Sequence, residues 1–400
     1  MSACVDAECA AESACVDAAM SACVDAEDTP AAAVVRAREL LWLREVLLAH
    51  TRGCALVQRE PGNALARFLF SSALTRGAGE DAVLPGHAAR DASLCRELAS
   101  AGADEAGVAA ACAALCAASG AAAARVAAVQ ARGAEGEVFL VRLDGQYQVM
   151  WRQVRVSISA PHLHTLRRLY AEHTPQDAGE GAFTRRLFCA LKRYDALDGP
   201  TYQCNVPGEA FAALEAEFGA LKECFASPFN HNAEVYWSAF PDTDGWFGSR
   251  GSFFDALASP LVQEGGAFYA NPPFVEEHLE RLRARVEEML ALDAAVTFAV
   301  VLPTWTDTAC HAWMQGSAYT RAFFVLAAGE HAYIDGRQQA ETRRWRKRHL
   351  ARAPSSVFVL QNAQGAAARP VNEATRGRLE AAFRRASRTG CEAETARDSV

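Results

Sequence analysis

The hydrophobic pattern of the chain changes character near residue 133. Before this point apolar residues recur at helical spacing, between Val34 and Arg52 and again between Val108 and Gln130, which predicts helices. Beyond it the chain has short apolar runs rich in β-branched and aromatic residues, which predict strands; these runs cover 137–142, 148–158, 234–240, 266–270, 296–302, 322–326 and 355–362. Because strands and helices alternate after residue 133, the sequence predicts a mixed α/β fold preceded by a helical region.

These changes divide the chain into five segments. The motif Ser-Ala-Cys-Val-Asp-Ala begins at Ser2, Ser13 and Ser21, in copies too short for a solenoid. The surrounding composition is acidic, rich in alanine and free of aromatic residues, which predicts a disordered tail over 1–30. The other predicted segments are a helical domain (31–132), a mixed β/helical segment packing on the core (133–222), the α/β core (223–365), and a polar C-terminal helix and tail (366–400).

Charge and cysteine content exclude several classes of protein. The formal net charge is −8, and the first 30 residues hold seven acidic residues and no Lys or Arg, so the body is nearly neutral and any contact with a polyanion must be local. The alanine-rich stretch 108–128 is interrupted by Gly120 and Arg125, so we predict no membrane span, and we find no secretory signal pattern. Thirteen cysteines lack histidines at ligand spacing, which favours free thiols and no metal site.

The tetrapeptide Asn271-Pro272-Pro273-Phe274 lies between a predicted strand and a predicted helix, where open α/β sheets bind ligands. The amide oxygen of Asn271 can accept a hydrogen bond from an exocyclic amine. The two prolines fix the backbone, so the Pro272 carbonyl can accept from the same amine, and the Phe274 ring can stack on a base. This pattern predicts a site for a nucleobase amino group held in line with a methyl donor. The alternative is an ordinary turn after a strand.

A second candidate segment follows the strand at 234–240. It begins with Pro241-Asp242-Thr243-Asp244 and ends with Gly248-Ser249-Arg250-Gly251. Glycines allow close approach of a ligand to the backbone, and carboxylates can bind ribose hydroxyls or an amino group. The segment therefore predicts a nucleoside-binding loop, with a surface turn as the alternative.

Three stretches in this order resemble one family. Residues 223–230, residues 238–251, and Asn271–Phe274 with Glu276-Glu277 are similar to the cap-specific adenosine N6-methyltransferases, the phosphorylated-CTD-interacting factor family. The resemblance covers about residues 137–365. It implies a Rossmann-like, S-adenosylmethionine-dependent core preceded by a helical domain. It also implies a nuclear enzyme that methylates N6 of the cap-adjacent adenosine, the first transcribed and 2′-O-methylated residue of capped mRNA.

The resemblance assigns roles to individual residues. It implies that catalysis uses Asn271, Pro272, Pro273 and Phe274. It implies that S-adenosylmethionine contacts Ser227, Pro228, Asn230, Asp242, Asp244, Phe247, Gly248, Ser249 and Asn271. Substrate contacts are expected at Glu276, Trp305, Glu330, His331, Arg142 and Arg167. Among these, Trp305 can stack on the cationic 7-methylguanine of the cap, the carboxylates can bind its polar edge, and the arginines can bind the triphosphate bridge. The alternative for Trp305 is a core residue at a strand end.

Two departures from the family pattern affect these expectations. Animal members carry a WW module at the N-terminus, where this chain has the acidic repeat, so contact with the RNA polymerase II tail is open. Gly329 and Thr304 stand where an aromatic and an acidic residue are expected, so the cap pocket is expected to differ in detail. Two alternative functions stay open, an N6-adenine methyltransferase acting on internal RNA or DNA, and a catalytically inactive protein that binds caps or RNA.

Overall fold

The structure is a computed structural model that describes residues 27–51, 64–66, 68–69, 80–85, 92–100, 102–133, 136–143, 146–174, 179–197, 203–334 and 348–388. Three predicted features lie outside these residues: the acidic repeat before residue 27, the turn at 144–145, and the end of the chain beyond 388.

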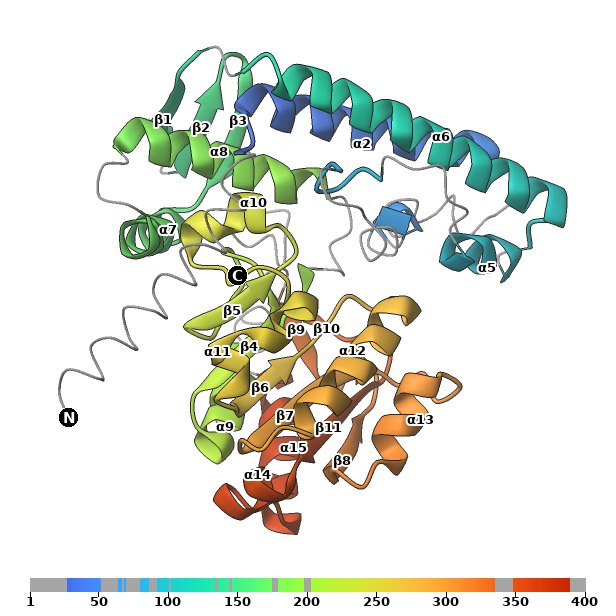
Figure 1. Cartoon of the computed structure of the whole chain (residues 1–400), viewed down its shortest axis with the longest axis vertical. Helices are drawn as coiled ribbons and strands as arrows, with labels where there is room; N and C mark the ends of the chain where they lie inside the picture. The colour runs from blue at the N-terminus through green and yellow to red at the C-terminus, as the bar shows by residue number, and fades with distance from the viewer. Residues whose placement is uncertain are drawn as a thin grey trace, which may run out of the picture.

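Long helices form the N-terminal region, as the sequence predicts. They are α2 (Pro30–His50), α5 (Ala92–Ser100) and α6 (Glu105–Gln130), and α2 and α6 lie side by side along the top of Figure 1. Each of these two has a side-chain cap that satisfies a free N–H of the first turn: Thr29 accepts from the Ala32 N–H, and Asp104 accepts from the Gly107 N–H. By length and composition α6 could cross a membrane, and one of its faces is buried against α2.

A small antiparallel sheet follows, with two helices packed on one face. Its strands are β1 (Val138–Leu143), β2 (Gln146–Trp151) and β3 (Val154–Ile158), in that order across the sheet. The helices are α7 (Ala160–His173) and α8 (Glu180–Ala196). The buried residues Val149, Trp151 and Ile158 share one face because side chains alternate along a strand, and Trp151 contacts Phe188 of α8.

The core of the molecule is a six-stranded sheet in the order β5-β4-β6-β7-β11-β8. Its strands are β4 (Leu221–Ala226), β5 (Val235–Ser238), β6 (Gly266–Ala270), β7 (Val296–Pro303), β8 (Thr320–Leu326) and β11 (Ser355–Gln361). The pairs β4–β5, β4–β6 and β6–β7 are parallel, whereas β11 is antiparallel to both β7 and β8. Every residue of β7 and β11 is buried, which is typical of a sheet covered on both faces. The sheet is therefore mostly parallel, and the predicted mixed α/β fold is confirmed.

Helices cover both faces of this sheet (Figure 1). On one face α12 (Glu276–Leu290), α13 (Ala309–Gly316) and the 3₁₀ helix η3 (Phe253–Ala258) form an apolar layer, and on the other α9 (Gly208–Phe218) and α15 (Glu373–Arg388) do so. Because Leu379 and Phe383 of α15 are buried in that layer, the core extends beyond residue 365, where the sequence pattern placed its end. The remaining short elements are α10 (Pro241–Asp244), η2 (Gly245–Phe247), α11 (Pro260–Gln263), β9 (Ala332–Ile334), β10 (Arg348–Leu350) and α14 (Ala363–Ala368).

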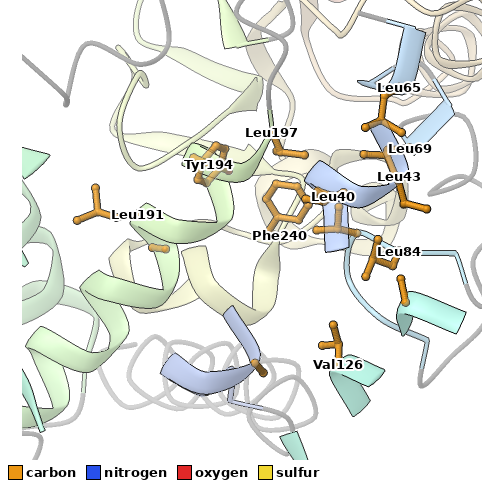
Figure 2. Close-up of a cluster of buried hydrophobic side chains, with 14 of the residues drawn as sticks. Leu40, Leu43, Leu65, Leu69, Leu84, Val126, Leu191, Tyr194, Leu197 and Phe240 are labelled. Carbon is orange, nitrogen blue, oxygen red and sulfur yellow. The ribbon is translucent and has the colours of Figure 1, made fainter. Parts of the chain in front are cut away.

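The helical region and the core share one apolar cluster and one buried ion-pair cluster. In Figure 2, Leu40 and Leu43 of α2 and Tyr194 and Leu197 at the end of α8 surround Phe240, which follows β5. Buried ion pairs join the same elements: Asp28–Arg36 at 2.7 Å, Asp28–Arg193 at 2.9 Å, Arg193–Asp242 at 2.6 Å and Arg36–Asp81 at 2.8 Å.

Asp28 therefore belongs to the folded part of the chain, although the sequence pattern placed it in the tail. Its side chain is 2% exposed and sits between two arginines. The pattern could not show this, because both arginines reach Asp28 only through tertiary packing.

Replacing Asp28 with alanine is expected to lower the free energy of unfolding by about 3–5 kcal/mol. The change would leave Arg36 and Arg193 buried without this carboxylate, and breaking a buried ion pair carries a cost of this size. Denaturant unfolding measures the loss. Asp195→Ala is the matched control, because Asp195 is 57% exposed and pairs with Lys192 at the surface, where such pairs contribute about 0–1 kcal/mol. Equal losses in the two variants would contradict the role given to Asp28.

Candidate functional site

A cavity of about 320 Å³ opens at the carboxyl ends of the parallel strands, a volume in the range of small-molecule sites. The chain crosses from β4 to β5 on one side and then to β6 on the other side of β4, so the cavity lies where an open α/β sheet has its crevice. The end of α8 contributes Tyr194 and Leu197 to the wall of the cavity. The residues that line the cavity are Tyr194, Leu197, Gln203, Cys204, Cys224, Phe225, Ala226, Ser227, Asn230, Ser238, Ala239, Phe240, Pro241, Ser252, Phe253, Phe254, Asp255, Asn271, Pro273, His278 and Arg281.

Asn271 follows β6 directly and is buried, with 9% of its surface exposed. Its amide nitrogen donates to the Cys204 carbonyl at 3.1 Å, which fixes the orientation of the amide because a carbonyl can only accept. The amide oxygen is buried and receives no hydrogen bond from any part of the chain that the structure describes. An unsatisfied buried acceptor costs about 1–3 kcal/mol. A ligand N–H would therefore find a free, oriented acceptor here.

The other three residues of the tetrapeptide lie around Asn271. Pro273 lines the cavity, and Pro272 is buried beside it. Phe274 is half-buried and meets Trp305 edge to face, with ring centroids 6.4 Å apart. Trp305 is 36% exposed and does not line the cavity, so it lies at the surface next to the tetrapeptide and not in the core.

The turn after β4 forms another part of the cavity wall. The Ser227 backbone N–H and its hydroxyl both donate to the Asn230 amide oxygen, at 2.7 and 2.9 Å. The Asn230 nitrogen donates to the Gln203 carbonyl at 2.9 Å. Ser227 and Asn230 line the cavity, whereas Pro228 is buried and does not. These bonds hold the turn at the cavity in one conformation.

The acidic, glycine-bearing segment after β5 reaches the cavity through Pro241, whereas Asp242 and Asp244 do not line it. Asp242 binds Arg193 through both oxygens, and Asp244 accepts from the Tyr194 hydroxyl at 2.6 Å. Burial acts to raise the pKa of Asp242, but the Arg193 guanidinium outweighs it and the pKa is lowered. The two carboxylates do not line the cavity, and their expected contact with a cofactor stays a prediction.

The three other residues of this segment that are expected to contact a cofactor do not line the cavity either. Phe247 is fully buried against Tyr170, and the Ser249 hydroxyl is 2.7 Å from the Ser238 hydroxyl. Gly248 has φ +95°, and a Cβ atom there would lie 2.5 Å from the His173 ring, so both its backbone and its surroundings require glycine. Their expected cofactor contacts also stay predictions.

Asp244 makes the stability of the fold depend on pH. Burial raises its pKa from the ordinary value of 3.8 to about 7, so between these values the folded state holds a proton that the unfolded state releases. Stability contributed by this group therefore falls as pH rises from about 4 to 7, by up to about 4 kcal/mol. Asp244→Asn keeps the shape, and its unfolding free energy relative to the parent is expected to rise over this window in denaturant titrations.

Asp242→Asn is the control of opposite sign for that titration. Its folded pKa is lowered, so the carboxylate stabilises the fold above its ordinary pKa of 3.8, and the variant is expected to lose stability at neutral pH. Parallel pH profiles for the parent and Asp244→Asn would show that the Asp244 proton is not held by the fold.

The six residues expected to bind the substrate are dispersed, and none lines the cavity. Glu276 pairs with Arg96 of α5 at 3.3 Å, and Glu330 pairs with Arg384 of α15. His331 is buried and 2.8 Å from the Ser355 hydroxyl, and burial lowers its pKa. Arg167 binds Glu180 at 2.6 Å, and Arg142 lies over the Tyr147 ring of the small sheet. Trp305 contacts the tetrapeptide through Phe274.

Several cavity residues had no assigned role in the sequence analysis. Phe253, Phe254 and Asp255 follow the glycine-bearing segment, and that position was the available signal. Tyr194, Leu197 and Gln203 come from the end of α8 and the segment after it, and no local pattern marks them, because tertiary packing brings them to the cavity.

Fold and cavity together define a mixed α/β protein with a ligand site at the carboxyl edge of a mostly parallel sheet, compatible with a methyltransferase core. A family model described as the phosphorylated CTD interacting factor 1 WW domain matches residues 165–336, which run from α7 to β9. An mRNA (2′-O-methyladenosine-N(6)-)-methyltransferase of Mus musculus is 34% identical over 240 residues, 58% of this chain and 32% of that protein. The protein of the same name from Homo sapiens is 33% identical over 264 residues, 64% of this chain and 36% of that protein.

These matches confirm the resemblance that the motifs indicated. The aligned part is about a third of the length of the curated relatives. The matched region contains the tetrapeptide and the turns that line the cavity.

Proposed function

We propose that this protein is an S-adenosylmethionine-dependent methyltransferase that methylates N6 of the cap-adjacent adenosine of capped mRNA. The observation that carries the proposal is the buried Asn271 amide oxygen beside the cavity, which receives no hydrogen bond from the described residues and can accept one from the adenine amine. The printed names of the mouse and human relatives support the reaction and the substrate.

The topology supports a Rossmann-like core. Four strands, β5, β4, β6 and β7, are parallel, with a crevice at the reversal of strand order. Ser227, Asn230 and Ser238 present neutral polar groups to the cavity, and Phe240 and Phe253 present flat apolar faces, a set that fits a nucleoside and an amino acid. These residues would hold S-adenosylmethionine, which supplies an electrophilic methyl group when bound.

In this proposal, residues of the chain orient the adenine amine. The Asn271 oxygen and the Pro272 carbonyl accept its two N–H bonds, which turns the nitrogen lone pair out of conjugation with the ring. Phe274 offers a stacking face for the base, and the apolar walls exclude water. Fixing two reacting groups in line can supply about 7–11 kcal/mol of rate enhancement.

Recognition of the cap is assigned to the surface beside the tetrapeptide. Trp305 is exposed enough to stack on a base and is braced by Phe274. A cationic 7-methylguanine adds a cation–π interaction to that stacking. We propose capped RNA as the partner and the nucleus as the location. A link to the RNA polymerase II tail rests only on the description of the matching family.

Methyl transfer from labelled S-adenosylmethionine tests the proposal. The full chain is incubated with matched RNAs that begin with adenosine, one capped with 7-methylguanosine and one uncapped, and with an adenine-containing DNA. We expect label only on capped RNA, recovered as N6-methylated cap-adjacent adenosine after digestion. Label at internal RNA positions or in DNA would favour the internal N6-adenine enzyme, and cap binding without label would favour the inactive binding protein.

A further inference from the structure

Gln203 is a second amide at the cavity whose orientation the structure fixes. It is buried, with 7% of its surface exposed. Its nitrogen lies 3.3 Å from the Tyr194 carbonyl and 3.4 Å from the Leu197 carbonyl. The Tyr194 carbonyl belongs to the last turn of α8, where helical carbonyls lose their intrahelical partners, and Leu197 is the residue that follows the helix. Because these two groups can only accept, the side-chain nitrogen of Gln203 faces α8 and the oxygen faces away.

The Gln203 side-chain oxygen is buried, and none of the residues placed by the structure donates a hydrogen bond to it. The side chain lines the cavity, as Asn271 does. Within the described part of the chain, the cavity thus holds two oriented amide oxygens that receive no hydrogen bond. Since one buried acceptor without a donor is already unfavourable, two in one cavity indicate that the bound ligands together bring two hydrogen-bond donors.

The backbone around Gln203 places these two oxygens in different parts of the site. The Gln203 carbonyl accepts from Asn230 in the turn after β4, and the Cys204 carbonyl accepts from Asn271 after β6. The segment therefore crosses the crevice. Gln203 lies next to α8 and the turn after β4, and Cys204 lies next to Asn271 at the end of β6. The adenine amine of the RNA is already assigned to Asn271. The Gln203 oxygen therefore accepts from another N–H group of a ligand, nearer to the turn after β4.

We propose that the Gln203 side-chain oxygen accepts a hydrogen bond from the α-ammonium group of the methyl donor. This inference rests on the proposed function, because it takes S-adenosylmethionine as the donor. A neutral oxygen that only accepts hydrogen bonds is suited to a cationic N–H group. It is not suited to the carboxylate of S-adenosylmethionine, which also only accepts. The other nitrogens that could supply the N–H are the adenine amine of the RNA and the adenine amine of the methyl donor itself, and the experiment separates both from the α-ammonium.

The test is a double-mutant cycle on binding, read by calorimetry with the full chain. The two ligands are S-adenosylhomocysteine and an analogue that lacks only the α-amino group and keeps the adenine amine. We expect the parent protein to bind the analogue about 10- to 100-fold more weakly, because a charge-assisted hydrogen bond is lost. Gln203→Met keeps the length of the side chain but removes the amide. In this variant the dissociation constants of the two ligands should differ by no more than about threefold.

A second glutamine provides the matched control. The Gln263 nitrogen holds the Leu257 carbonyl at 2.6 Å, and this residue does not line the cavity. Gln263→Met should therefore keep the full difference in affinity between the two ligands that the parent shows. Equal weakening of both ligands in Gln203→Met would indicate either a structural role for Gln203 or a hydrogen bond to the adenine amine that both ligands share, and either result would overturn the inference.

Two further outcomes also decide against the inference. If the parent binds both ligands equally, the ammonium is not recognised, whatever the stability of the variant. If Gln203→Met leaves S-adenosylhomocysteine binding unchanged but raises KM for RNA, the N–H comes from the adenine amine of the RNA. Failure of the proposed function looks different, since the parent would then transfer no methyl group and bind neither ligand.

Discussion

Asn271→Ala is expected to lower kcat by about 100-fold or more and to leave the affinity for S-adenosylhomocysteine within about threefold of the parent. The parent has a buried amide oxygen already oriented by the Cys204 carbonyl, so it need not reorganise when the amine arrives. Removing one preorganised polar contact at a reacting centre typically costs about 2.7–4 kcal/mol of transition-state stabilisation. Single-turnover kinetics on capped RNA, together with calorimetry for the donor product, measure the two effects separately.

Asn232→Ala is the matched control for this variant. Asn232 is an exposed residue in the segment between β4 and β5, and it does not line the cavity. Its replacement should leave both constants unchanged. If Asn271→Ala keeps its turnover within about threefold of the parent, Asn271 has no part in catalysis. If donor affinity falls together with kcat, the amide supports the cavity as a whole and does not act on the amine alone.

Local pattern was sufficient to predict most of the core. The fully apolar runs of β7 and β11 predict buried strands because a strand covered on both faces needs no polar alternation. The position of Asn271 was also predictable, since a turn between a strand and a helix places its first residue at the carboxyl edge of the sheet.

Contacts distant in sequence were not predictable in the same way. Asp28 and Asp242 are far apart along the chain, yet Arg193 binds both in the buried ion-pair cluster. The sequence shows three charged residues of types that are usually exposed, and nothing local indicates that they meet. The pattern therefore placed Asp28 in the tail and gave no indication that Asp242 pairs with Arg193.

The same limit explains which parts of the site were missed. The Gln203 amide is oriented by two carbonyls at the end of α8, those of Tyr194 and Leu197. This arrangement depends on tertiary packing, so no local pattern marks Gln203. The end of α8 lines the cavity through Tyr194 and Leu197 and packs against α2 in one apolar cluster. The helical region therefore packs on an element that lines the site, so its separation from the core is expected to expose the end of α8.

Trp305→Ala is expected to raise KM for 7-methylguanosine-capped RNA by about 10- to 100-fold and to change KM for uncapped RNA much less. Methylated guanine brings a positive charge to the indole face, and such a contact contributes about 2 kcal/mol when desolvated, beyond about 1–3 kcal/mol for stacking itself. The side chain lies outside the cavity and contacts the tetrapeptide only through Phe274, so kcat should change less than KM. Both constants are measured on capped and uncapped RNAs of the same sequence.

Trp313→Ala separates cap recognition from a general loss of aromatic surface. Trp313 is a partly buried tryptophan on α13 that packs on the core and lies near Arg283. Its loss should lower the melting temperature and affect both RNAs equally, because it removes core contacts and no ligand contact. Trp305 is 36% exposed, so Trp305→Ala should melt close to the parent. A lowered melting temperature with equal losses on capped and uncapped RNA would assign Trp305 to packing and leave the cap to other residues.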